Sequence, residues 1–198
     1  DISNWDVSSA NNFSLMFHVA RSFDQNIRRW SVSDSADLTN MFSEADLMQS
    51  NRGVSSTPSS NFFDSTAPTL SSITPADNAP AVATTSNIVL NFSEAVDLES
   101  GNIVIYKASD DSAVETFNVA SSGLISGSGS TQITINPSND LEEQTQYYVQ
   151  IAATAFDDSA GNSYAGINDT TSLSFTTADE TAPILSSSTP ADNATAVA

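Results

Sequence analysis

Between residues 67 and 178, short runs of apolar residues alternate with polar ones, and turn residues separate the runs. The alternating apolar positions are Ile88, Leu90 and Phe92; Ile103 and Ile105; Phe117 and Val119; Ile133 and Ile135; Tyr147, Val149 and Ile151; and Leu173 and Phe175. A period of two places such side chains on one face of a strand. Repeated short strands of this kind predict an Ig-like antiparallel β-sandwich. The intervening positions, among them Tyr148 and Ser174, are expected to face water.

The segment before Tyr147 carries a more specific signal. Leu141 precedes this tyrosine by six residues, and the tyrosine opens a predicted strand. This arrangement is typical of a tyrosine corner, in which the phenol oxygen bonds a backbone group a few residues upstream. We therefore expect Tyr147 to have a structural role.

Residues 1–50 contain two units of 25 residues. The identical pairs are Ile2/Ile27, Trp5/Trp30, Val7/Val32, Ser8/Ser33, Met16/Met41, Phe17/Phe42 and Ala20/Ala45. In each unit, an apolar face at spacings i, i+3, i+4 and i+7 predicts a short helix, over residues 13–20 and again over 38–45. With a strand at residues 2–7, this period predicts a leucine-rich-repeat-like α/β solenoid fragment.

A longer duplication marks the remaining boundaries. Residues 64–83 return as residues 179–198 with 16 of 20 positions identical, and such a spacing fits a whole domain. We expect repeats over 1–50, a linker over 51–66 that Phe62 and Phe63 pin to a neighbour, and the sandwich over 67–178. Residues 179–198 would form a linker and the first strand of a second sandwich, poorly ordered unless another sheet pairs with it.

The charge is strongly one-sided. The chain has 24 acidic residues against 5 arginines and lysines, a formal net charge of -19. Such a surface repels nucleic acid and anionic membranes, so neither is an expected partner. No apolar run is long enough to insert into a membrane. The absence of cysteine and the single histidine, His18, exclude Cys/His zinc sites and Ser-His-Asp triads in the sandwich.

The acidic residues favour calcium over catalysis. Adjacent carboxylates such as Asp157 and Asp158 are poorly placed as a catalytic pair, whereas Ca²⁺ is bound by loop oxygens of carboxylates, amides and carbonyls. At the entrance of the sandwich, we expect Asp64 to approach the loop residues Asp157, Asp158 and Asn162. At the exit, Asp179 and Glu180 would approach Asp77, Asn78, Glu142 or Glu143. Bound Ca²⁺ at either joint would stiffen it, and the alternative is that these acids are solvated turn residues.

Two resemblances complete the interpretation. The sandwich resembles bacterial Ig-like domains of the S-layer-protein type in Thr66-Ala-Pro, Leu90-Asn-Phe-Ser-Glu-Ala-Val, Asp158-Ser-Ala-Gly-Asn162 and Ser174-Phe-Thr-Thr177. The first 50 residues resemble BspA-like, mycoplasma lipoprotein-type leucine-rich surface repeats, with Trp-x-Val-Ser followed by Met-Phe-x-x-Ala. The resemblances imply a fragment of a large bacterial surface or secreted protein, with no catalytic residues in the sandwich.

Together these observations predict a non-enzymatic spacer or display module in adhesion, located outside the cell. Its partners would be neighbouring domains of the same chain and a cell-surface glycan or protein. The alternative is an accessory, glycan-binding module of a polysaccharide-degrading enzyme. A glycan-binding sandwich needs exposed planar aromatics, and the candidates are Tyr106, Tyr148, Tyr164 and Phe156.

Overall fold

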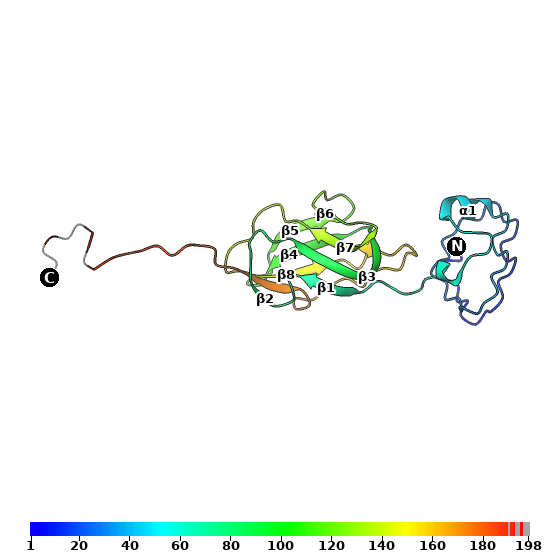
Figure 1. The fold of residues 1–198 in the computed structure, drawn as a ribbon, viewed down its shortest axis with the longest axis horizontal. Helices are drawn as coiled ribbons and strands as arrows, with labels where there is room; N and C mark the ends of the chain where they lie inside the picture. The colour runs from blue at the N-terminus through cyan, green and yellow to red at the C-terminus, as the bar shows by residue number, and fades with distance from the viewer. Residues whose placement is uncertain (190, 193–194, 196–198) are drawn as a thin grey trace.

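The computed structural model of the chain describes residues 1–189, 191–192 and 195. It comprises an N-terminal module (residues 1–63), a β-sandwich (residues 64–178) and an extended tail, arranged along one long axis (Figure 1). Residues 181–188 carry no strand, and Ile184 and Leu185 are 88% and 84% exposed. The strand expected in the second copy of the duplication falls partly on positions 190, 193–194 and 196–198, outside the described residues.

The sandwich consists of two facing sheets. In the first, the order is β1 (Leu70–Thr74), β3 (Ile88–Leu98), β7 (Ser130–Ile135) and β6 (Ile125–Ser126), and β9 (Phe156–Asp157) also pairs with β3. In the second, the order is β2 (Ala79–Val82), β10 (Ser174–Thr177), β8 (Gln146–Ile151), β4 (Asn102–Lys107) and β5 (Ala113–Asn118). The β2–β10 pair is parallel and the other pairs are antiparallel, so the predicted Ig-like antiparallel sandwich is confirmed.

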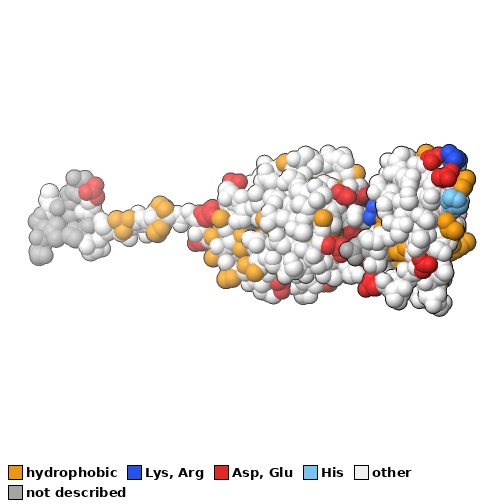
Figure 2. All heavy atoms as spheres, turned by 45° about the vertical axis from the view of Figure 1, so that its right-hand side comes forward, with side chains coloured by type: hydrophobic (Ala, Val, Ile, Leu, Met, Phe, Trp, Pro, Cys, Tyr) orange, Lys and Arg blue, Asp and Glu red, His pale blue; other side chains and the backbone are white. Residues whose placement is uncertain are grey.

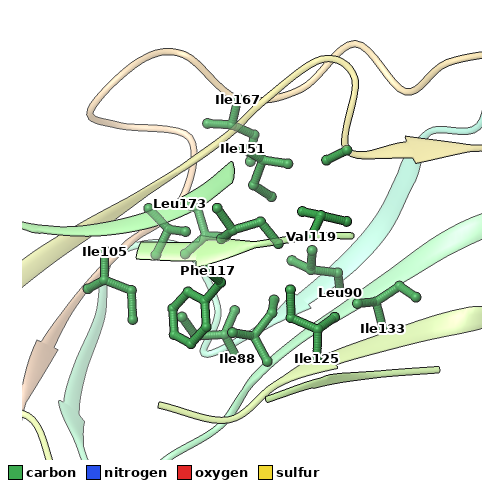
Figure 3. Close-up of a cluster of buried hydrophobic side chains, with 14 of the residues drawn as sticks. Ile88, Leu90, Ile105, Phe117, Val119, Ile125, Ile133, Ile151, Ile167 and Leu173 are labelled. Atoms are coloured by element: carbon green, nitrogen blue, oxygen red, sulfur yellow. The ribbon is translucent and has the colours of Figure 1, made fainter. Parts of the chain in front are cut away.

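The core lies between the sheets, and every alternating apolar position named above is buried. Side chains from both sheets point toward one another, among them Ile88 and Ile133 from the first sheet and Ile105 and Phe117 from the second (Figure 3). Burial of each such side chain contributes about 1.5–3 kcal/mol before conformational entropy is counted. This core holds the sandwich without disulfides, since the chain has no cysteine.

The tyrosine corner is confirmed. The backbone N–H of Glu142 donates a hydrogen bond of 2.9 Å to the phenol oxygen of Tyr147, whose side chain is fully buried. Two of the expected water-facing positions are wrong, however. Tyr148 is buried because Tyr106 stacks on it at 4.9 Å and Asp111 accepts its hydroxyl, and Ser174 is buried because β2 covers it and the Asp77 carboxylate accepts its hydroxyl.

In the N-terminal module the predicted helices over 13–20 and 38–45 are wrong, because these segments form turns, and residues 2–7 form no strand. A leucine-rich-repeat solenoid is therefore not what the structure shows here. The backbone takes left-handed φ angles at Leu15 and Val19, at 57° and 59°, and at their counterparts Asn40 and Glu44, at 53° and 56°. These values interrupt a right-handed helix twice in each unit.

The two units, residues 1–25 and 26–50, instead stack through a ladder of backbone bonds. The N–H groups of Phe13, Leu15, Phe17 and Val19 donate to the carbonyls of Asp37, Thr39, Met41 and Ser43, at 2.8–3.1 Å. Alternate N–H groups along residues 13–19 thus bond to the second unit, while those of Met16 and His18 bond within their own turn. The repeat read from the sequence is real, but it encodes stacked turns.

Residues 51–63 complete this module. The helix α1 (Asp46–Arg52) begins in the second unit and runs two residues past its end, and a turn of 3-10 helix, η1 (Ser60–Phe62), follows. Val54 and Phe62 are buried with Trp30 and Phe42 in the module's own core, and Phe63 packs against it. The expected pinning of Phe62 and Phe63 to a neighbour is therefore confirmed.

Candidate functional site

The N-terminal module and the sandwich meet at a loop that follows β9. In this loop, Oδ1 of Asp158 accepts hydrogen bonds from the backbone N–H groups of Ala160 and Asn162, both at 2.8 Å. Gly161 lies between them with a φ of 88°, a left-handed value that favours glycine. The loop therefore closes on its own aspartate, and Asp158 and Asn162 are only 5% and 4% exposed.

Asn162 is the centre of the joint. Its Nδ2 donates to Oδ2 of Asp158 at 2.7 Å and to the backbone carbonyl of Asp64 at 2.9 Å. Its Oδ1 accepts a hydrogen bond of 3.1 Å from Nε of Arg29 in the N-terminal module. One buried amide thus links the loop, the connecting segment and the neighbouring module.

Two further bonds cross the joint. Nδ2 of Asn26 donates to the carbonyl of Ala160 at 3.1 Å, and the N–H of Asp64 donates to the carbonyl of Arg28 at 2.6 Å. The guanidinium of Arg28 lies over the ring of Phe62, 4.5 Å from its centroid, and so ties the joint to the core of the module. On the surface, acidic side chains of the sandwich lie beside a basic side chain of the module at this junction (Figure 2).

Three carboxylates converge beside Asn162. Asp64, Glu94 and Asp158 each offer a carboxylate oxygen, and these oxygens lie within 4.8 Å of one another. Burial raises the pKa of Glu94 above its ordinary value, and the negative charges of Asp64 and Asp158 raise it further. Such a set of hard oxygen donors has the chemistry that Ca²⁺ or Mg²⁺ requires. Both oxygens of Asp158 already accept hydrogen bonds, so it has less capacity left for a cation than the other two.

The sequence-based site agrees with this geometry in part. The structure brings Asp64, Asp158 and Asn162 together as expected, but Asp157 lies in β9, opposite Asp97 of β3. Glu94 was missed because nothing in its local pattern shows that β3 carries it beside residues so distant in sequence. The available signal was the break in alternation after Phe92, where the register between β3 and β7 shifts.

The acidic residues expected to meet at the exit of the sandwich accept hydrogen bonds from different groups. Glu180 accepts from the backbone N–H and the hydroxyl of Thr84, at 3.2 and 2.8 Å. Asp77 accepts from Ser174, and Asp179 accepts from the N–H of Thr181. Within the described residues, the structure does not bring these acids into a group of three or more.

The aromatic candidates for glycan binding do not form an exposed platform. Phe156, Tyr148 and Tyr164 are 0%, 5% and 8% exposed. Phe156 and Tyr164 pack edge to face against Phe92, at 5.2 and 5.3 Å between ring centroids. No helix in the described part of the chain has the length and apolar character needed to cross a membrane.

Comparison with known families gives two matches. Residues 64–177 match a family described as bacterial Ig-like domain, and residues 1–66 match one described as Mycoplasma protein of unknown function. No curated protein sequence matches the chain.

Solved structures similar to this chain include CopC, a copper resistance protein and an S-layer protein. CopC from Methylosinus trichosporium OB3b is 16% identical, with 59% of this chain and 99% of CopC covered and a TM-score of 0.42. The copper resistance protein PcoC from Escherichia coli is 20% identical, with 55% and 98% covered and a TM-score of 0.35. Domains 1–6 of the surface layer protein SbsC are 14% identical, with 81% of this chain but only 19% of SbsC covered and a TM-score of 0.41.

Proposed function

Because this chain belongs to the bacterial Ig-like domain family through residues 64–177, we propose that it is a non-catalytic spacer and display module of a bacterial cell-surface or secreted protein. In this role the sandwich holds the N-terminal module away from the rest of the protein. The N-terminal module is the contact surface for a cell-surface glycan or protein in adhesion. Its partners within the chain are the domains on either side.

The observation that carries this proposal is the joint at Asn162. A spacer transmits position only if its modules are fixed to one another, and a linker of polar residues would leave them free. Here direct bonds from Asn26, Arg28 and Arg29 hold the module against the sandwich. The two parts therefore extend along one axis (Figure 1).

The calcium expected from the sequence belongs to this proposal as a reinforcement of the joint. We propose Asp64, Glu94 and Asp158 as its ligands, because their oxygens converge where the modules meet. A cation there would offset the mutual repulsion of three carboxylates and so hold Asp64 to the loop.

Small-angle X-ray scattering tests the spacer role. A fixed joint gives one elongated particle with a narrow distribution of maximum dimension at both low and high salt. Arrays of glycans and of extracellular proteins test the contact role: binding by the whole chain is expected to be lost when residues 1–63 are removed. A broad, salt-dependent dimension contradicts the spacer, and binding retained by the sandwich alone contradicts the contact assignment.

A further inference from the structure

The two units of the N-terminal module carry identical residues in opposite environments. Trp30 is 1% exposed and Met41 is 0% exposed, whereas their counterparts Trp5 and Met16 are 54% and 42% exposed. Phe42 and Ala45 are likewise fully buried, while Phe17 and Ala20 are only half-buried. The first unit covers these residues of the second unit, whereas nothing in the described chain covers the equivalent side of the first unit. We call this uncovered surface the open side. Hydrophobic side chains gather beside the chain's single histidine, His18, on the end of the module away from the sandwich (Figure 2).

The open side also has an unused row of acceptors. The carbonyls of Asp37, Thr39, Met41 and Ser43 accept the ladder bonds of the first unit. Their counterparts one repeat earlier are the carbonyls of Asn12, Ser14, Met16 and His18, and no hydrogen bond from a described residue reaches them. The indole N–H of Trp30 also donates to the carbonyl of Ile2 at 2.9 Å, a bond for which Trp5 has no counterpart in the described chain.

The opposite side of the stack is closed. The N–H of Phe42 donates to the carbonyl of Ser56 at 2.9 Å, and the N–H of Asn40 donates to the hydroxyl of Thr57 at 2.8 Å. These two bonds replace those that Phe17 and Leu15 make to the second unit. Residues 56–57 therefore cap the donor side, and the stack has one capped end and one open end.

We propose that the open face, formed by Trp5, Met16, Phe17 and the carbonyls of residues 12, 14, 16 and 18, receives a further 25-residue unit of the same pattern, carried in the same polypeptide. The existing interface between units continues without change if one more unit is added there. The occupant must present N–H donors to the four carbonyls, and it must accept hydrogen bonds from the indole N–H of Trp5 and the N–H of Asn12, the counterparts of the donors of Trp30 and Asp37. A second copy of this chain cannot supply all four donors head to tail, since residues 56–57 already accept the N–H groups of Phe42 and Asn40 on its donor side. Leu15 and Val19 are exposed but lie outside this face, because their counterparts Asn40 and Glu44 are exposed as well.

Methionine oxidation tests the proposal, because Met41 and Met48 are both fully buried and serve as internal references for Met16. In the chain as it stands, hydrogen peroxide is expected to oxidise Met16 much faster than either reference. A copy of residues 1–25 is then added ahead of Asp1, with leucine replacing its methionine. Covering the face is expected to slow Met16 oxidation by about tenfold or more, towards the rate of Met41.

A matched extension in which proline replaces the residues equivalent to Leu15 and Phe17 lacks two of the required donors. It is expected to leave Met16 as reactive as in the unextended chain. The proposal is overturned if the intact extension leaves Met16 reactive while Met41 stays protected, whether or not the added unit folds. It is also overturned if Met16 in the unextended chain becomes protected as protein concentration rises, since self-association would then be what covers the face.

Discussion

The Nε–H of Arg29 donates to Oδ1 of Asn162 across the boundary between the two modules, at 3.1 Å. The amide that accepts this bond is itself fixed by Asp158 and by the carbonyl of Asp64. Arg29 is thus held by a group that cannot rotate away without breaking bonds inside the sandwich. This relationship converts a chain connection into an oriented joint.

Arg29→Ala is expected to loosen the joint while leaving both modules folded. A hydrogen bond with one charged partner contributes about 1.5–3 kcal/mol, and the bonds of Asn26 and Arg28 remain. The distribution of maximum dimension in X-ray scattering should broaden, and the rotational correlation times of the two modules should separate in ¹⁵N relaxation.

The control is Arg21→Ala, which removes exposed ion pairs with Glu44 and Asp46 and leaves the bonds that cross the joint in place. This variant should behave as the unmodified chain does, because such surface pairs contribute little. Equal broadening in both variants would mean that Arg29 does not orient the modules.

Tyr147→Phe is expected to destabilise the sandwich by about 1–3 kcal/mol, because the N–H of Glu142 loses its acceptor. Urea titration followed by fluorescence or circular dichroism measures the change. Tyr148→Phe is the matched control: its hydroxyl bonds the exposed Asp111, which water can satisfy, so a loss below about 1 kcal/mol is expected. A loss below about 0.5 kcal/mol for Tyr147→Phe would rule out the corner as a stabilising feature.

The sandwich was predictable because its signals are local. The alternation at Ile88, Leu90 and Phe92 and the corner at Tyr147 each depend on a few neighbouring residues and on burial of one strand face. The N-terminal turns were not predictable in this way. The spacing of Phe13, Met16 and Phe17 is helical, but the N–H groups of Phe13 and Phe17 donate to the second unit, which only the stacked structure reveals.

The contacts at the joint could likewise be predicted from the sequence only in part. Proximity of Asp64 to Asp158 and Asn162 followed from the general path of a chain into a sandwich. Glu94 completes the carboxylate group because of the shift in register within β3, and Arg29 reaches Asn162 because the N-terminal module packs directly on the loop. Neither follows from residue spacing.

Asp169→Asn is expected to alter the acid limb of the stability curve. The hydroxyl of Ser172 and the backbone N–H groups of Thr171 and Ser172 lower the pKa of Asp169 to about 2. Its folded pKa lies below its unfolded value, so the stabilisation is present above about pH 4 and is lost as pH falls toward 2. Urea titrations at pH 2, 3, 4 and 7 should show a shallower loss for the variant between pH 4 and 2. Parallel curves for the two proteins would contradict the assignment.

Glu94→Gln is expected to stabilise the chain at neutral pH. The folded pKa of Glu94 is raised, so the native state holds its proton more strongly than the unfolded state does. Stability therefore falls as pH rises from the unfolded pKa, about 4.3, through the folded pKa. The variant should be more stable by a few tenths of a kcal/mol at pH 7 and equal below pH 4. Glu99→Gln, at an exposed position, controls for net charge. An equal gain in stability from Glu99→Gln would mean that the lower net charge, and not the surroundings of Glu94, causes the stabilisation.

Calcium should make the unmodified chain more stable than the Glu94→Gln variant, which reverses the order expected without calcium. If Asp64, Glu94 and Asp158 hold the ion, its binding turns their repulsion into attraction, and extracellular sites of this kind bind at about 10⁻⁴–10⁻³ M. At ten times the dissociation constant, the unmodified chain should gain about 1.4 kcal/mol, visible as a higher melting temperature. Glu94→Gln should gain little, because an amide replaces one of three charged ligands. Sodium chloride at matched ionic strength separates binding from screening. An unchanged melting temperature and scattering profile in 10 mM calcium would show that the three carboxylates remain a source of strain at the joint without a cation.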